Sequence, residues 1–432
     1  RMKKVLVVTY YWPPSGGAGV QRWLKFVKYL RRYQWEPVVY TPENPEAPAE
    51  DVTLLSDVPD GLEVIKTRIW EPYTIYKRIT GRKKDEKVKA GFLSEKKTGS
   101  PLESFSIWVR GNLFIPDARK YWIKPSVRFL NEYLRDHPVD VMATNGPPHS
   151  MHLIGLRLKK RFDIPWLADF RDPWTGIDFY DQLKLSSQAD RKHKKLEQMV
   201  VSNADRLTTV SWSWAEELKD LGGREVSVIT NGYDPEDFMI PPVETPGSFM
   251  ITHIGALNRD RNTPVFWKML AEKCRSEEQF SRDLRIRFIG FTDVSVFESL
   301  EECGLSGKVE KPGYLPHNEA MKLASGSALL FLPLNNTPNV KGIIPGKIFE
   351  YLALKRPVVC IGPEDGDSAR ILKETEAGYV AGFGNAEGMK RIIDETYNRF
   401  RKNTLNVPGD KIGQYSRIEK TGELAEILND ML

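Results

Sequence analysis

The chain has 432 residues, of which 41% are hydrophobic and 28% are charged, so it is long enough for two or three domains with cores of their own. This composition excludes a disordered chain, and the longest apolar runs, such as 328–332, are too short to span a membrane. The three cysteines stand far apart in the sequence, which indicates neither a disulfide framework nor a zinc site. The short apolar run at 5–8 does not resemble a signal peptide. We therefore expect a cytoplasmic protein.

The positive charge is concentrated in one segment. The net charge of the chain is +5, but residues 77–97 hold nine Lys and Arg against three Asp and Glu, so the rest of the chain is close to neutral. A nucleic-acid-binding protein usually spreads its basic residues over the face of a domain, so we expect no nucleic-acid partner. The segment indicates either a local anionic partner or a solvated loop.

The first part of the chain alternates strand and helix patterns. An apolar strand at 4–10 is followed by a glycine-rich loop, a helical repeat of apolar residues at 20–30 and a second strand at 36–40. This βαβ order predicts a parallel sheet. Further strands are expected at 139–144, 165–170, 206–210 and 226–230. Together these elements predict a first domain over residues 1–238 that carries the basic insertion 77–97.

A second series of elements follows a segment rich in proline. Residues 240–248 hold three prolines and a glycine without an apolar period, which indicates a linker. The strands expected next lie at 249–255, 284–290, 328–332 and 357–361, and the helices at 264–273 and 346–354. They predict a second domain over residues 249–410 and a C-terminal helix within 411–432 that packs back on the first domain. The predicted fold is α/β, with two Rossmann-like domains facing across a cleft.

The glycine-rich loop is the first candidate binding element. Gly16, Gly17 and Gly19 would let the backbone approach a phosphate or an acceptor, and the helix that follows would offer free N–H groups. The loop has neither the G-x-G-x-x-G spacing of a dinucleotide fold nor the Lys-Ser/Thr of a P-loop. A tight turn with a purely structural role is the alternative.

A second candidate lies where a helix begins near Gly346. The first-turn N–H groups and Lys347 would both face an anion, so a diphosphate fits there. Glu350 lies three residues after Lys347 on the same helix face and could accept two ribose hydroxyls. The alternative is a simple Lys–Glu surface pair.

Two further clusters stand at the ends of expected strands. Gly255 opens a loop in which Arg259 and Arg261 are suited to phosphate oxygens, although a solvated loop is the alternative. In the first domain, two neighbouring strand ends carry His149 on one side and Asp169, Arg171 and Asp172 on the other, and we expect these four residues at the mouth of the cleft. His149 and His152 have no third ligand nearby, so we expect no metal site.

Taken together, these motifs resemble the GT-B glycosyltransferases of the large retaining family 4. The resemblance rests on the Gly16-Gly-x-Gly19 loop, on Asn231-Gly-Tyr-Asp234, on the 255–261 loop and on Pro345-Gly-Lys-x-Phe-Glu-Tyr351. Pro147-Pro-His149 and Asp169-Phe-Arg-Asp-Pro-Trp174 resemble a bacterial subgroup that synthesises surface polysaccharides. The sequence departs from the family pattern at Gly342, where many members have glutamate, and at Arg171, where many have histidine.

The resemblance implies a sugar transfer from a nucleotide-diphosphate sugar to a hydroxyl of a glycan or lipid-linked acceptor, with retention and without a metal or cofactor. It places the ribose at Glu350 and the diphosphate at Lys347 and Arg261. Gly17 and Gly19 would lie beneath the donor phosphate or the acceptor, and His149, Arg171 or Asp172 would take the catalytic role.

Two alternatives from other classes are a nucleotide-sugar epimerase and a non-catalytic module that binds anionic surfaces. The basic segment 77–97 leads us to expect a peripheral position on the anionic inner face of the plasma membrane.

Overall fold

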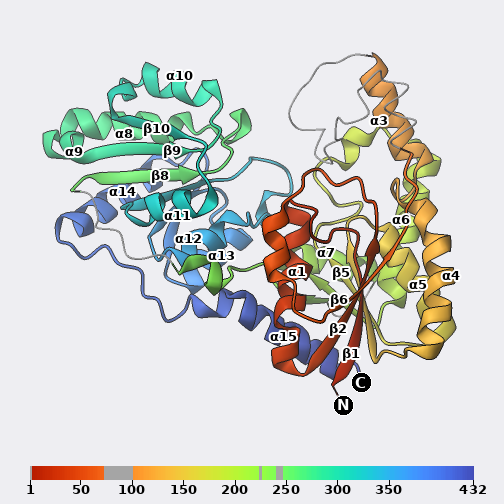
Figure 1. Cartoon of the computed structure of the whole chain (residues 1–432). Helices are drawn as coiled ribbons and strands as arrows, with labels where there is room; N and C mark the ends of the chain where they lie inside the picture. Colours follow the sequence, from red (N-terminus) through yellow and green to blue (C-terminus); the bar gives the residue numbers. More distant parts are fainter. Residues whose placement is uncertain (1, 73–100, 223–225, 240–246) are drawn as a thin grey trace. The chain divides into compact units, whose positions relative to one another are not determined.

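The computed structural model describes residues 2–72, 101–222, 226–239 and 247–432. The basic segment 77–97 and most of the expected linker 240–248 lie outside these ranges. The chain forms two compact units, one of residues 1–230 with 420–432 and the other of residues 231–419. Each unit contains one parallel sheet with helices on both faces (Figure 1), which is the two-domain Rossmann-like architecture predicted from the sequence.

The first unit is built on a seven-stranded sheet in the order β3-β2-β1-β4-β5-β6-β7, and all of its pairings are parallel. Helix α1 covers one face, and α4 and α5 cover the other (Figure 1). The strands are β1 (Lys3–Val8), β2 (Trp35–Pro42), β3 (Glu63–Thr67), β4 (Val141–Gly146), β5 (Trp166–Phe170), β6 (Arg206–Thr209) and β7 (Val226–Val228).

Six helices lie wholly within the described part of this unit, and a seventh enters it. They are α1 (Ala18–Leu30), α3 (Pro101–Leu113), α4 (Lys120–Asp136), α5 (Ser150–Phe162), α6 (Ser187–Asn203) and α7 (Trp212–Gly222), followed by α15 (Arg417–Asp430) at the C-terminus. Leu424 and Leu428 of α15 are fully buried in the core of this unit. Short 3₁₀ turns occur at Arg31–Tyr33, Val52–Asp57 and Tyr180–Leu183.

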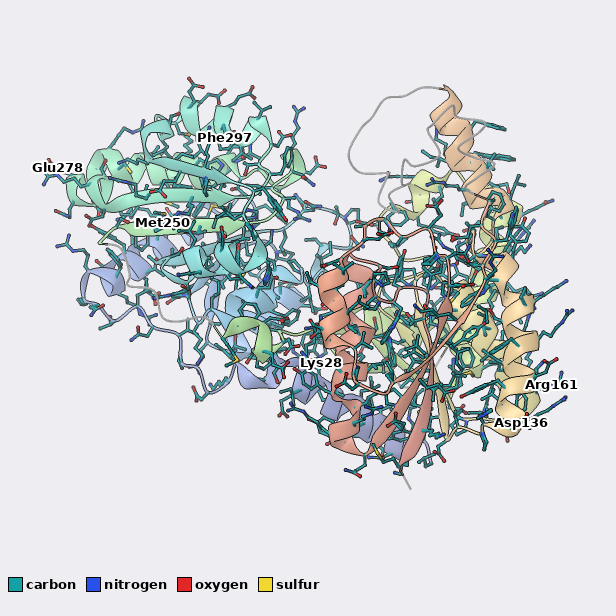
Figure 2. All side chains as sticks on the ribbon, in the orientation of Figure 1. Lys28, Asp136, Arg161, Met250, Glu278 and Phe297 are labelled. Atoms are coloured by element: carbon teal, nitrogen blue, oxygen red, sulfur yellow. The ribbon has the colours of Figure 1, made fainter. Side chains whose placement is uncertain are left out.

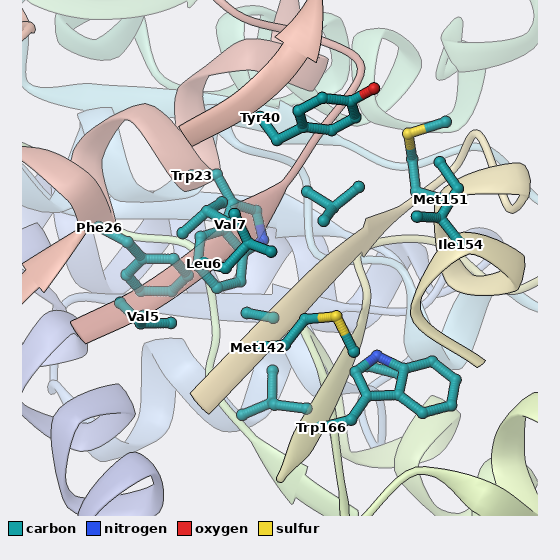
Figure 3. Close-up of a cluster of buried hydrophobic side chains, with 14 of the residues drawn as sticks. Val5, Leu6, Val7, Trp23, Phe26, Tyr40, Met142, Met151, Ile154 and Trp166 are labelled. Atoms are coloured by element: carbon teal, nitrogen blue, oxygen red, sulfur yellow. The ribbon is translucent and has the colours of Figure 1, made fainter. Parts of the chain in front are cut away.

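The core of the first unit forms on both faces of β1. Trp23 and Phe26 of α1 lie toward one face, and Met151 and Ile154 of α5 lie toward the other (Figure 3). Because β1 is covered on both faces, its residues form a continuous apolar run rather than an alternating one. This is the pattern that made the strand recognisable in the sequence.

The second unit repeats the plan with six parallel strands in the order β10-β9-β8-β11-β12-β13. The strands are β8 (Phe249–Ile254), β9 (Leu284–Ile289), β10 (Val309–Gly313), β11 (Leu329–Pro333), β12 (Val358–Ile361) and β13 (Gly378–Ala381). The helices are α8 (Pro264–Ser276), α9 (Glu278–Asp283), α10 (Val294–Glu302), α11 (His317–Ser325), α12 (Lys347–Ala353), α13 (Asp367–Glu374) and α14 (Ala386–Arg401). The 3₁₀ turns are Pro235–Phe238, Arg259–Arg261, Ser306–Lys308, Val340–Gly342 and Gly413–Tyr415.

Apolar side chains fill the interior of each unit, and charged side chains lie mainly at the surface. Met250 of β8 is buried, whereas Asp136, Arg161 and Glu278 are exposed at the surface (Figure 2). No helix in the described ranges is both long enough and apolar enough to cross a lipid bilayer.

The strands that sequence analysis missed are all at sheet edges. β3 and β10 have no buried residue, and β13 has one. An edge strand is covered less than a central one, so it needs no run of apolar residues and gives a weak signal. The central strands, in contrast, match the predicted positions within a few residues.

Candidate active site

In the second unit, helix α12 is fixed against the carboxyl ends of two central strands. The hydroxyl of Tyr351 accepts a hydrogen bond from the Ile254 N–H at 3.1 Å and donates one to the Phe331 carbonyl at 3.1 Å. Tyr351 lies four residues after Lys347, so the two side chains share one face of the helix. The anchoring of Tyr351 between β8 and β11 therefore also directs Lys347 to this end of the sheet.

Two glycines allow close packing beside Lys347: Gly255 leaves room for the lysine, and Gly290 leaves room for Gly255. Gly255 follows β8 with φ +89°, and a Cβ on it would lie 3.1 Å from the Lys347 Nζ atom. Gly290 follows β9 with φ +103°, and a Cβ on it would lie 3.2 Å from the Gly255 carbonyl oxygen. A positive φ disfavours other residues at both positions, and the close approach of Lys347 disfavours them again at Gly255.

Lys347 and Arg261 form a pair of partly buried cations. The Lys347 Nζ atom lies 3.3 Å from Nε2 of His253, and the Arg261 Nε atom donates to Oδ1 of Asn335 at 3.0 Å. Burial, and then the charge of Arg261, lowers the pKa of Lys347 to about 8. Burial also lowers the pKa of Arg261. Neither cation forms a salt bridge within the described part of the second unit, and the charge of Glu350 offsets that of Lys347 only in part.

His253 takes part in this cluster as a neutral side chain. It is 2% exposed, and burial, followed by the charges of Lys347 and Arg261, holds its pKa well below the ordinary value. A neutral imidazole can accept the hydrogen bond of Lys347 at Nε2. His253 gives no signal in the sequence because it stands inside an apolar strand, and Asn335 gives none because its loop has no recognisable motif.

Glu350 lies on α12, three residues after Lys347, with about one-third of its side chain exposed. Its Oε1 atom lies 3.0 Å from Nε2 of His317. The negative charge of Glu350 raises the pKa of Lys347, which opposes the lowering by burial and Arg261. The structure thus brings Gly255, Arg261, Lys347 and Glu350 to one end of the sheet.

The other two expected donor-binding residues are more exposed. Gly346 is exposed immediately before α12, and no atom would meet a Cβ there within 4 Å. Arg259 is exposed in its 3₁₀ turn, and its charge contributes to lowering the pKa of Asp293. Arg259 is therefore solvent-exposed and lies outside the partly buried cation pair, although only one residue separates it from Arg261 in the sequence.

In the first unit, the glycine-rich loop is joined to residues 49–51. The Gly16 N–H donates to the Ala49 carbonyl at 2.9 Å, and the Asp51 N–H donates to the Pro14 carbonyl at 2.8 Å. The N–H of Gly16 is therefore already used within the protein. Gly17 is exposed with φ +93°, the conformation that precedes α1.

Gly19 makes room for Arg171. A Cβ at residue 19 would lie 2.6 Å from the Nη1 atom of Arg171 and 2.9 Å from the ring of Tyr11. The Arg171 guanidinium also lies 5.7 Å from the centre of the Tyr11 ring, and its Nε donates to Oδ2 of Asp172 at 3.1 Å. Its Nη1 is buried without a hydrogen-bond partner.

His149 stacks on Trp174, and hydrogen bonds link Trp174 to His193 and His193 to the backbone. Its ring stacks on Trp174 with centres 4.5 Å apart, Trp174 Nε1 donates to Nδ1 of His193 at 3.2 Å, and His193 Nε2 is 3.2 Å from the Gly111 carbonyl. Burial, and then the neighbouring His152 and Arg171, keep the pKa of His149 well below its ordinary value. His149 is thus a neutral imidazole whose Nδ1 is buried without a partner.

His152 has a structural role. It is fully buried, and its Nδ1 lies 2.8 Å from the Thr144 hydroxyl, which also accepts a hydrogen bond from the Trp166 indole at 2.9 Å. Burial lowers the pKa of His152 to about 3, so it too is neutral.

The expectation that Asp169 lies at the mouth of the site is wrong. Asp169 is 1% exposed, and both of its oxygens bind Arg22 at 2.8 Å. Trp23 and Thr208 each donate a further hydrogen bond to it at 2.8 Å. The side chain points from β5 into the protein, because alternate residues of a strand face opposite sides of the sheet. Asp172, three residues later and beyond the strand, is partly exposed.

Comparisons with known proteins agree with this architecture. Residues 92–237 match the family described as Glycosyltransferase Family 4. No curated protein matches the chain by sequence.

Solved structures match along the whole chain at low sequence identity. Sucrose-phosphate synthase from Thermosynechococcus elongatus is 12% identical, with a TM-score of 0.59 and 99% of each chain covered. Anabaena Alr3699/HepE, solved in complex with UDP-glucose, is 14% identical, with a TM-score of 0.56 and 99% of each chain covered. WaaG, a glycosyltransferase involved in lipopolysaccharide biosynthesis, is 12% identical, with a TM-score of 0.54 and coverage of 98% of this chain and 99% of that chain.

At these identities the structural matches establish the fold, and the family match adds the activity. The seven-stranded and six-stranded parallel sheets are the two Rossmann-like domains of the GT-B fold. With its Glycosyltransferase Family 4 domain at residues 92–237, the chain is a glycosyltransferase of the GT-B fold.

Proposed function

We propose that the second unit binds the nucleoside diphosphate part of the donor sugar and that Lys347 and Arg261 hold its diphosphate. The observation that carries this proposal is the partly buried cation pair, which lacks a salt-bridge partner in the described part of the unit. Burying positive charge is unfavourable unless an anion compensates it. A diphosphate supplies that anion, and the UDP-glucose complex of one structural neighbour supports a donor of this class.

Glu350 is the proposed ribose ligand. A carboxylate can accept hydrogen bonds from two neighbouring hydroxyls, and Glu350 lies one helical turn from the proposed diphosphate ligand Lys347. Its partial exposure leaves it accessible to a nucleotide. Gly255 and Gly346 allow the backbone around the site to approach the donor.

The two cations would act mainly in the transition state. When the bond to the sugar breaks, negative charge grows on the leaving diphosphate and positive charge grows on the sugar. Fixed positive groups next to the diphosphate stabilise this separation of charge more than they stabilise the ground state. Lys347 and Arg261 supply the positive charge that a metal ion provides in other transferases, so we propose a reaction without a metal or cofactor.

In the first unit we propose that Asp172 and His149 serve the acceptor. Asp172 is a partly exposed carboxylate that can accept a hydrogen bond from the attacking hydroxyl, and the neutral Nδ1 of His149 is a second acceptor. Arg171 orients Asp172 through the hydrogen bond from its Nε atom. We propose that transfer proceeds with retention, as the family resemblance implies.

The proposed acceptor is a glycan or a lipid-linked glycan at an anionic membrane face. The basic segment 77–97 supports this proposal by its charge. On α3, which follows it in the sequence, Phe105 is 61% exposed and Trp108 is 39% exposed, and such aromatic side chains suit a membrane interface. Sedimentation with vesicles of graded anionic lipid content tests the proposal. Binding that does not rise with anionic lipid and fall with salt would contradict it.

The reaction itself is tested by incubating the protein with a panel of nucleotide sugars, with and without glycan acceptors. We expect release of the nucleoside diphosphate that depends on the acceptor. Isomerisation of the donor sugar would instead show an epimerase, and binding without either reaction would show a non-catalytic module.

A further inference from the structure

His317 and Glu350 form a direct contact between two helices of the second unit. His317 is the first residue of α11, and Glu350 lies in α12, which packs against the sheet through Tyr351. The His317 Nε2 atom lies 3.0 Å from Oε1 of Glu350. This distance is that of a good hydrogen bond, in which the imidazole N–H donates to the carboxylate.

The surroundings of His317 favour its charged form. The hydrogen bond with Glu350 raises the pKa of His317 above its ordinary value, against the opposing effect of burial. Asp237 also faces it and acts in the same direction, as does a hydrogen bond with Asn318. The ring of Phe238 packs edge-on against the imidazole at 6.2 Å. Lys347 also interacts with Glu350 through its charge.

We propose that His317 is a positioning residue of the donor site, which holds the Glu350 carboxylate in the orientation that binds the ribose and offsets its negative charge. The inference rests on the proposed function, because it assigns His317 a role through Glu350. Neither the family pattern in the sequence nor the comparisons assign a role to this histidine.

Two physical reasons support the role. First, a partly exposed glutamate samples several rotamers, and one hydrogen bond to Oε1 selects among them while the remaining lone pairs stay available to hydroxyls. Secondly, a bare carboxylate next to the bound diphosphate would repel it. An imidazolium in contact with the carboxylate reduces that repulsion.

The proposal is tested with a double-mutant cycle in the full-length protein. The ligand is the nucleoside diphosphate, among UDP, GDP and ADP, that gives the largest thermal shift, and its Kd is measured by calorimetry. We expect His317→Ala to raise the Kd about threefold to tenfold, the effect of one hydrogen bond. His317→Gln, whose amide can donate to Glu350, should recover most of the affinity. In a Glu350→Ala background, His317→Ala should have no further effect.

The pH dependence gives a second readout that a purely structural role would not change. In the wild type, affinity should fall as pH rises through the titration of His317, because the imidazolium loses its charge. His317→Gln has no titrating group at this position and should lack that component. The titrations of Lys347 and of the nucleotide phosphate occur in both proteins, so the difference between the two pH profiles isolates His317.

The outcomes separate this inference from the proposed function. If Glu350→Ala binds the nucleotide as the wild type does, both the ribose site and the role of His317 are wrong. If Glu350→Ala weakens binding but His317→Ala does not, only the role of His317 is wrong. An equal loss on His317→Ala with and without Glu350 would also overturn it, because His317 would then act independently of the carboxylate.

Discussion

The Lys347 Nζ atom lies 3.3 Å from Nε2 of the buried His253, so this cation contacts a neutral imidazole and not a carboxylate. A lysine that has no role in binding or catalysis is usually exposed to solvent or paired with an acidic group. Here the second cation, Arg261, adds repulsion that lowers the pKa of Lys347. The arrangement is unfavourable in the empty protein and becomes favourable when an anion binds.

A first prediction follows for the stability of the empty protein. Lys347→Met removes the buried charge and keeps a similar volume of side chain, so it should raise the melting temperature of the nucleotide-free protein. A gain of about 1 kcal/mol corresponds to a shift of roughly 2–4 °C for a unit of this size. Thermal unfolding with and without nucleoside diphosphate measures both effects. A lower melting temperature without nucleotide would mean that Lys347 has a stabilising partner.

A second prediction concerns pH. Because the pKa of Lys347 is lowered to about 8, the free enzyme should lose positive charge in the donor site as pH rises through that value. We expect kcat/KM for the donor to fall above about pH 8, because kcat/KM reports groups of the free enzyme. A Lys347→Arg variant keeps its charge and should not show this fall. A wild-type profile that stays flat to pH 9 would contradict the assignment.

A third prediction compares two glycines of the same site. Gly255→Ala should destabilise the protein by about 1–2 kcal/mol, because φ is +89° and the new methyl group would press on Lys347. Gly346→Ala should leave stability nearly unchanged, since nothing lies within 4 Å of its Cβ position and φ is −55°. Denaturant unfolding of both variants checks this. Equal effects would mean that the space around Gly255 is not restricted.

A fourth prediction separates two neighbouring aspartates. Asp169→Asn breaks the bidentate contact with buried Arg22 and should cost about 3–5 kcal/mol of stability. Asp172→Asn should leave stability within about 0.5 kcal/mol, because Asp172 is partly exposed, and should reduce sugar transfer. Unfolding curves and transfer rates of the two variants check the pair. Normal activity in Asp172→Asn would remove this residue from the proposed acceptor site.

The central strands and the donor-site motif could be predicted because their signals are local. β1, β8 and β11 are buried strands rich in apolar residues, and the residues from Gly346 to Glu350 lie within about one helical turn. The edge strand β3 could not be found in this way, because its exposed face requires no apolar pattern. His317 was missed for a different reason. It is 33 residues from Glu350 in the sequence, and only the packing of two helices brings the residues together.

The error at Asp169 has a similar origin. Residues 169–172 are all polar or aromatic, but the sequence does not show which of their side chains face the interior. Burial of Arg22 on α1 determines that Asp169 points inward, and this partner lies 147 residues away. A carboxylate near the end of a strand can therefore hold a helix in place and need not contact a ligand.

The most direct test of the account compares binding of nucleoside diphosphate and nucleoside monophosphate to the wild type, Lys347→Met and Arg261→Ala. The wild type should prefer the diphosphate strongly, because its second phosphate meets the cation pair. In both variants the affinity for the diphosphate should fall by about tenfold or more, as expected for loss of a charge-assisted contact, while the affinity for the monophosphate changes much less. An equal loss for both ligands, or an unchanged preference for the diphosphate, would contradict the assignment of Lys347 and Arg261 to the donor diphosphate.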